Sequence, residues 1–436
     1  MHYMKPKQDE QLIRSVGVFG LSANIVNIII GSGIFVLPAI VAAGMGSSAI
    51  YAYLFCGVLI TCIMLCFAEA GSKINKTGGP YTYIETAFGP FAGFLAGVFS
   101  VVASILSVAA VSNALVNILG VYLPVFQESY ARILFLLLVF GGLAYANVLG
   151  IKQGIGLVKM FVLFKLTPLF LIIVLGWSEV SYDNFNFQTF PGIEALGATS
   201  LILFFAFLGA ESAVTVGGEV LRPKKTFPQA ILIGILTVLA VYVMVQTVAQ
   251  GVLGEELKNH TSAPLAETAR RIMGKPGFII LIVGAALSMF GNLSGQILNV
   301  PRVLYALSRD KVIPVPYFSR IHKKYKTPYT AIMMYSIIGL CVAVAGNFEQ
   351  LAVISTSTGL LLYLGVVLAV IKLRYTQKTT AEEFQVPGGL MIPVVSVAVI
   401  LYFLSHLPGN EMIGTLIFGV IVSALYFINR NLIQKG

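Results

Sequence analysis

The chain has 436 residues, of which 57% are hydrophobic and 11% are charged, and its mean hydropathy is +0.89. Soluble domains carry about 25% charged residues, so this composition excludes a soluble globular protein and indicates a chain that crosses a membrane many times. The net charge of +10 would suggest a nucleic acid partner in a soluble protein, but here the distribution of the charges points to membrane topology instead.

The polar segment Met1–Gln11 is expected to be a cytoplasmic tail and not a signal peptide. Twelve apolar stretches follow, each long enough for a membrane-spanning helix. They are Val16–Ala43, Ile50–Gly71, Tyr83–Leu119, Ile133–Val148, Gly156–Trp177, Ile193–Val216, Phe227–Gly251, Gly277–Leu307, Ala331–Ala345, Leu351–Leu373, Leu390–Leu407 and Met412–Ile428. The sequence therefore predicts an all-α integral membrane protein.

The basic residues alternate in density between successive connections. Of the 28 Lys and Arg residues, 22 fall in the segments expected on the inner side and one, Lys165, lies within a span. The five in outer segments are Arg132, Lys258, Arg270, Arg271 and Lys275. Because cytoplasmic loops are rich in Lys and Arg, this bias predicts a multi-pass protein of the cell membrane with both termini in the cytoplasm.

The first span contains Gly31-Ser32-Gly33, followed by Pro38, at its centre. Glycine costs about 1 kcal/mol in a helix interior, and lipid offers no water to backbone groups that lose their partners. The helix is therefore expected to be broken at this point, with its freed N–H and C=O groups facing a cavity.

A second interrupted span contains Phe204 to Ser212, with Gly209 at the expected break, five spans after the first. Five is an odd number, so the two units must have opposite orientations in the bilayer. Broken helices at matching positions of inverted halves are typical of secondary transporters. One transmembrane domain is expected over 1–436, with repeats over about 12–177 and 190–373 and two additional helices over about 388–430.

Several motifs occur in a fixed order along the chain: Gly31-Ser32-Gly33-Ile34-Phe35, Gly78-Gly79-Pro80-Tyr81, Phe205-Ala206-Phe207 with Gly209 and Glu211, Gly295-Gln296, and Arg302 to Asp310. Together they resemble the amino acid–polyamine–organocation transporter superfamily, which includes the arginine/agmatine exchanger and neutral L-amino acid exchangers. The resemblance implies twelve helices in a leucine-transporter-like fold, a five-plus-five inverted repeat in which helices 1 and 6 are discontinuous.

A zwitterionic amino acid needs partners for a carboxylate and an ammonium group. The half-helix after the first break offers the N–H groups of Ser32 and Gly33 to the carboxylate. The half-helices that end at the breaks offer the carbonyl groups of Ile29, Phe205 and Leu208 to the ammonium group. The resemblance implies the same positions, and the alternative is that the small residues only permit close helix packing.

These N–H and carbonyl groups form the expected substrate clamp. The resemblance also implies roles for side chains around this clamp. Phe205 corresponds to an aromatic gate over the substrate, and Phe290 is a weaker candidate for the same surface. Ala103, Ser104 and Val108 correspond to the side-chain pocket. Val108 stands where the arginine/agmatine exchanger has Asn, which argues against a guanidinium ligand and favours small or aliphatic neutral amino acids.

Two ionisable residues lie inside predicted spans, where such groups are usually functional. Lys165 matches a lysine that occupies the sodium position in sodium-independent relatives, so it is expected to couple transport to protons or to bridge helices; the alternative is that it snorkels to the inner edge. Glu211 is either a proton-sensing carboxylate or a structural acid at the second break. Glu69, Lys73 and Glu85 are expected in a cytoplasmic gate network.

The sequence thus predicts sodium-independent amino acid transport by alternating access, as proton-coupled symport or as exchange. The alternatives are a cationic amino acid or polyamine antiporter and, in a different class, an amino-acid-sensing membrane receptor. No enzyme motif occurs at membrane depth, and neither a cofactor nor a metal is expected. The expected partners are the amino acid, protons and the lipid bilayer, without nucleic acid, and the oligomeric state stays open.

Overall fold

The computed structural model describes residues 17–74, 79–150, 155–185, 191–211, 220–309, 313, 315–377, 380 and 383–433, and for 155–163, 223 and 429–433 it describes the backbone alone. The motif residues Gly78, Ser212 and Asp310 lie outside these ranges.

The described residues form helices and connections, with no β-strand among them, which confirms the all-α prediction. The helices are α1 (Val18–Ile29), α2 (Gly33–Met45), α3 (Ala49–Lys73), α4 (Pro80–Phe88), α5 (Pro90–Tyr122), α6 (Ser129–Val148), α7 (Ile155–Gly176), α8 (Ile193–Leu203), α10 (Pro223–Leu253), α11 (Pro264–Arg309), α12 (Tyr329–Ala345), α13 (Phe348–Thr376), α14 (Met391–Ser405) and α15 (Gly409–Ile433). Short 3-10 helices join them, of which η5 (Phe204–Phe207) continues α8 and η7 (Gly254–Asn259) follows α10.

Seven helical stretches among the described residues are long and apolar enough to cross a membrane. The shorter apolar helices are α1, α8 with η5, α12 and α14. Two of these, α1 and α8, are short because they end at the two predicted breaks. A multi-pass membrane protein is therefore confirmed, whereas the count of twelve spans and the inverted repeat stay predictions.

The predicted third span, Tyr83–Leu119, is wrong as a single helix. The backbone turns at Gly89, which has a φ of +91°, so that α4 and α5 are separate helices. Gly89 precedes Pro90, and the residue before a proline is disfavoured in a helix. The predicted span Gly277–Leu307 lies within α11, which bends at Gly274 (φ +65°).

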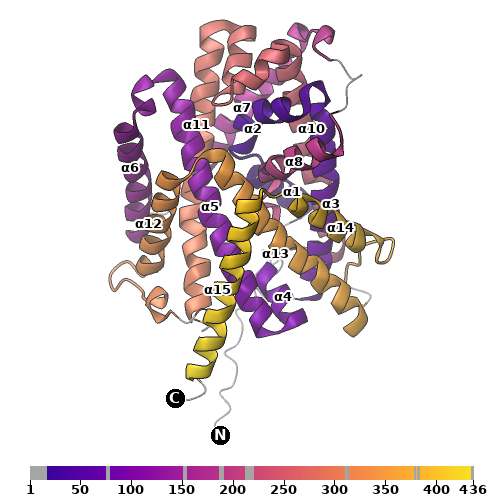
Figure 1. The fold of residues 1–436 in the computed structure, drawn as a ribbon, viewed down its shortest axis with the longest axis vertical. Helices are drawn as coiled ribbons and strands as arrows, with labels where there is room; N and C mark the ends of the chain where they lie inside the picture. The colour runs from indigo at the N-terminus through magenta and orange to yellow at the C-terminus, as the bar shows by residue number, and fades with distance from the viewer. Residues whose placement is uncertain are drawn as a thin grey trace.

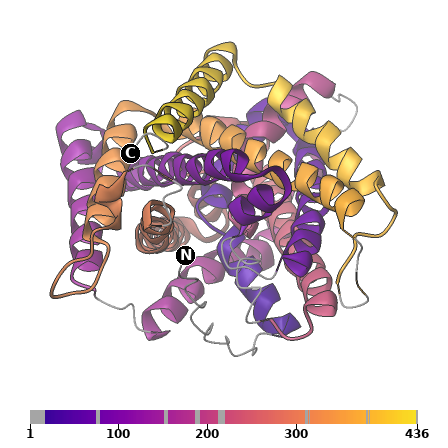
Figure 2. The same cartoon turned by 90° about the horizontal axis from the view of Figure 1, so that it is seen from below.

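The helix α5 lies at the centre of the bundle, where it packs along α13 and α11 (Figure 1). On the other side of the molecule, α1 and α3 pack along α10. Small residues allow such close contacts: a Cβ atom on Gly234 of α10 would lie 2.7 Å from the Ile25 side chain of α1. By contrast, α15 runs along the outside of the bundle (Figure 2).

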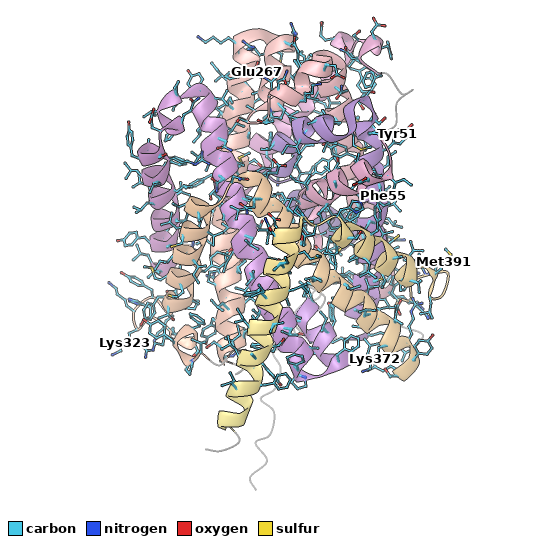
Figure 3. All side chains as sticks on the ribbon, in the orientation of Figure 1. Tyr51, Phe55, Glu267, Lys323, Lys372 and Met391 are labelled. Atoms are coloured by element: carbon cyan, nitrogen blue, oxygen red, sulfur yellow. The ribbon has the colours of Figure 1, made fainter. Side chains whose placement is uncertain are left out.

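Charged side chains lie at both ends of the molecule. Lys323 and Lys372 lie toward the end where α15 finishes, and Glu267 lies at the opposite end (Figure 3). The orientation of these ends in the membrane stays a prediction from the charge bias of the sequence.

Candidate functional site

The first helix is broken where the Gly-Ser-Gly sequence predicts. α1 ends at Ile29, and α2 begins at Gly33. Ser32 is buried and precedes α2, and among the described residues no hydrogen bond satisfies the backbone N–H groups of Ser32 and Gly33. Unpaired N–H groups at a helix start attract anions, because the helix dipole adds to their own partial charge.

The second break lies at Leu208 and Gly209. After η5, the Leu208 N–H donates to the Phe205 carbonyl oxygen at 3.3 Å, and Gly209 adopts a φ of +98°, a conformation that glycine tolerates. The Glu211 carboxylate accepts hydrogen bonds from the Gly209 N–H at 3.0 Å and from the hydroxyl of Tyr363 in α13. This geometry favours the structural role for Glu211, in which the acid holds the break open.

The two breaks touch each other. A Cβ atom on Gly33 would lie 2.8 Å from the Cβ atom of Ala206, and one on Gly209 would lie 3.1 Å from the Ile28 side chain. Any side chain larger than hydrogen on Gly33 would therefore push α2 away from η5. Residues that are far apart in the sequence thus meet at a single place, as expected for a shared binding site.

Tyr242 of α10 ties the breaks together, and the sequence did not reveal it. Its fully buried hydroxyl lies 3.0 Å from the carbonyl oxygen of Ile29 and 3.0 Å from that of Ala206. A buried tyrosine usually finds a partner for its hydroxyl, so a tyrosine in an apolar span was a signal that a polar group lay nearby. The sequence alone could not say which group.

The predicted pocket residues of α5 divide into two groups. Ala103 and Ser104 are half-buried, and their carbonyl groups accept hydrogen bonds from the hydroxyls of Ser355 in α13 and Tyr335 in α12. The Ser104 hydroxyl itself donates to Ser100. Their backbone is thus fixed by neighbouring helices.

Val108 packs towards α12. It is fully buried, and its methyl group lies 3.3 Å from the position of a Cβ atom on Gly339 in α12. This contact favours a packing role for Val108 between α5 and α12, and its place in the substrate pocket stays a prediction. The argument from Val108 against a guanidinium ligand likewise stays a prediction.

The two candidate aromatic residues have different surroundings. The Phe205 ring is 6% exposed and packs edge-on against Phe348 of α13, with 5.8 Å between ring centroids. Phe290 of α11 is 37% exposed, and among the described residues no aromatic ring packs against it. The structure thus brings Phe205 to the second break and gives it Phe348, not Phe290, as its ring partner.

A row of polar side chains leads from the first break towards α5. The Asn292 amide of α11 lies 3.4 Å from the position of a Cβ atom on Gly31, and its oxygen accepts a hydrogen bond from Gln296 at 2.7 Å. Gln296 also donates to the Ser107 hydroxyl at 3.4 Å. The sequence motif included Gln296, whereas Asn292 was missed because nothing in the sequence places it beside Gly31.

Lys165 of α7 is buried and does not snorkel. Its side chain is 8% exposed, and its ammonium group donates to the carbonyl oxygen of Asn27, near the end of α1. α7 also packs closely on α11, since a Cβ atom on Gly284 would lie 2.4 Å from the Pro168 ring. Lys165 therefore supports the helix that ends at the first break.

Glu69 of α3 is the centre of a buried cluster of charges. Its carboxylate accepts two hydrogen bonds from the Arg374 guanidinium of α13, at 2.8 and 2.5 Å, and one from the Val386 N–H. The Lys73 ammonium lies 3.4 Å away. Glu69 and Lys73 thus belong to one network as predicted, but among the described residues no ion pair joins Glu85 to it.

Comparisons with known proteins identify the family. A family model described as amino acid permease matches residues 16–430. The serine/threonine exchanger SteT of Bacillus subtilis is 28% identical, over 90% of each chain. The branched-chain amino acid permease BcaP of the same organism is 25% identical over 96% of this chain and 94% of its own. The b(0,+)-type amino acid transporter 1 of Rattus norvegicus is 27% identical over 98% of this chain and 89% of its own.

Proposed function

The chain belongs to the amino acid permease family of the amino acid–polyamine–organocation superfamily, and on this premise we propose that it carries amino acids across the cell membrane by alternating access. One observation carries the proposal: two broken helices meet at Gly33 and Ala206, where the N–H groups of Ser32 and Gly33 lack partners among the described residues. Broken helices that meet in this way suit a small charged solute.

The clamp has two halves. The N–H groups of Ser32 and Gly33 bind the substrate carboxylate, because they lack hydrogen-bond partners among the described residues. The carbonyl groups of Ile29, Phe205 and Leu208 bind the ammonium group. Ile29 and Phe205 already accept one hydrogen bond each, but a carbonyl oxygen has a second lone pair for the substrate.

The substrate is a small or aliphatic neutral amino acid. The carboxylate nearest the breaks, Glu211, already accepts hydrogen bonds from Gly209 and Tyr363, so it is poorly placed to pair with a cationic side chain. SteT and BcaP carry neutral amino acids according to their names. Phe205 closes over the substrate together with Phe348, while Phe290 stays a secondary candidate for this surface.

Transport is sodium-independent in this proposal. The Lys165 ammonium group occupies the space beside the end of α1 and already uses the Asn27 carbonyl, a group of the kind that coordinates sodium. The cycle then runs as proton-coupled symport or as exchange. Two inverted repeats of five spans each, followed by two additional helices and with both termini in the cytoplasm, provide the bundle that rocks about the site.

Uptake of labelled serine, leucine and arginine into proteoliposomes tests the proposal. We expect serine or leucine to enter at the same rate in sodium buffer and in choline buffer. We expect no uptake of arginine in either buffer. Stimulation by unlabelled substrate inside indicates exchange, and stimulation by an inward proton gradient indicates symport. Thermal stabilisation by an amino acid without any flux would instead support the sensing receptor. The absence of both binding and flux would overturn the assignment.

The variant Gly33→Val tests the clamp itself. Its side chain would collide with Ala206, so we expect binding to fall by more than about tenfold, the equivalent of 1.4 kcal/mol. Gly141→Val in α6 is the matched control, because nothing lies within 4 Å of a Cβ atom there. Equal substrate affinity in the two variants would remove the breaks from the binding site.

A further inference from the structure

A groove of about 310 Å³ separates α15 from α5 and α13. It lies on the outer side of the bundle, where α15 runs along the other helices (Figures 1 and 2). One end is lined by Gln350 at the start of α13 and by Asn410 and Glu411 at the start of α15. Further along, its walls are apolar and include Leu106 and Ile354. A groove that is polar at one end and apolar along its length matches the shape of an amphiphile.

The polar end of this groove lacks internal partners. In the part of the chain that the structure describes, the side chains of Gln350, Asn410 and Glu411 make no hydrogen bond or ion pair with another side chain or with the backbone. Glu411 is only half-exposed. A half-buried carboxylate beside an apolar wall is costly without a cation, so the site favours a ligand that brings a positive charge.

α15 contacts the bundle along a narrow seam. Aromatic pairs make this seam, with ring centroids 5.9 Å apart for Phe99 and Phe418 and 5.1 Å apart for Phe91 and Tyr426. In the apolar stretch of α15, 6% of the residues are buried. The rest of its surface faces lipid in the proposed membrane topology, on which this inference depends, so the groove opens towards the acyl chains.

We propose that the groove binds one phospholipid with a primary ammonium headgroup, phosphatidylethanolamine. The ammonium group pairs with Glu411, and the amide groups of Gln350 and Asn410 donate to the phosphate. One acyl chain lies along Leu106 and Ile354. A carboxylate disfavours phosphatidylglycerol, which is anionic, and the quaternary ammonium of phosphatidylcholine has no N–H to donate.

Native mass spectrometry of the purified full-length protein, titrated separately with the three phospholipids, tests this site without requiring transport. We expect one phosphatidylethanolamine to be retained at least about tenfold more tightly than either other lipid. Glu411→Gln removes the charge alone and should abolish this preference, whereas Glu349→Gln, outside the groove, should keep it. Transport can fail while lipid binding persists, so this test is separate from that of the transport function.

A second variant fills the groove. Nothing lies within 4 Å of a Cβ atom on Gly414, so Gly414→Leu can project into the space, with Gly141→Leu in α6 as its control. We expect Gly414→Leu to lose the retained lipid and Gly141→Leu to keep it. Equal binding of the three lipids, unchanged binding in both groove variants, or a dimer that excludes lipid would each overturn the proposal.

Discussion

At the scale of single residues, Tyr242 has the clearest expected effect. The substitution Tyr242→Phe removes the hydroxyl that joins the Ile29 and Ala206 carbonyls, and a buried polar group left unpaired costs about 1–3 kcal/mol. Because both carbonyls belong to the breaks, we expect substrate affinity and thermal stability to fall together. Calorimetric binding and a thermal unfolding curve measure the two effects.

Tyr53→Phe provides the matched control for Tyr242→Phe. Tyr53 is also fully buried and donates to the Gln246 side chain at 3.1 Å, in the contact between α3 and α10. This variant should lose stability without a specific loss of substrate affinity. If Tyr242→Phe binds substrate as tightly as Tyr53→Phe does, the hydroxyl does not position the breaks.

The residues at the breaks show how far a sequence can predict a site. Gly31-Ser32-Gly33 located the first break, because two glycines at the centre of an apolar span destabilise a continuous helix in lipid. Asn292 and Tyr242 were missed, since their neighbours at the first break lie more than 200 residues away and a single sequence does not encode which residues meet. Val108 shows the same limit: its helix was predicted, but its contact with α12 was not.

At the scale of elements, the Glu69 cluster fastens the end of α3 to α13 and to the segment before α14. Glu69→Gln would leave the buried Arg374 and Lys73 cations without a counter-charge, and loss of one partner of a buried pair costs about 3–5 kcal/mol. We therefore expect a large fall in the thermal unfolding temperature of the purified protein.

The exposed pair of Glu255 and Lys258 serves as the reference for Glu69. The two side chains are 79% and 47% exposed, and such pairs contribute about 0–1 kcal/mol. Glu255→Gln should therefore leave the unfolding temperature nearly unchanged. A Glu69→Gln protein as stable as Glu255→Gln would show that the buried cluster does not hold these helices together.

The helices themselves were largely predictable from hydropathy, whereas their interruptions were predictable only in part. The break in the first span is surrounded by apolar residues and stands out for that reason. The turn at Gly89 lies between a polar and an apolar stretch, not inside an apolar run. Hydropathy therefore did not mark it, and the predicted span continued through it. A glycine followed by proline was the local signal, because this pair disfavours a continuous helix.

At the scale of the whole molecule, the orientation of the chain depends on the charge bias, because hydropathy gives the spans and not their direction. The helix α11 separates Lys258, which lies in η7, from Lys323, which follows the helix. If α11 crosses the membrane once, these two positions lie on opposite sides. The excess of Lys and Arg around Lys323 then predicts that this side faces the cytoplasm.

Single cysteines introduced at these two positions test that orientation. Cys341 is exposed and is first replaced by serine, and this parent protein serves as the unlabelled control. We expect a membrane-impermeant maleimide to label Lys258→Cys in intact cells and Lys323→Cys only after permeabilisation. Labelling of both from outside would mean that α11 does not span the membrane, and the reverse pattern would place both termini outside. Since the direction of the spans decides which gate faces the cytoplasm, this result also decides from which side Phe205 closes the proposed site.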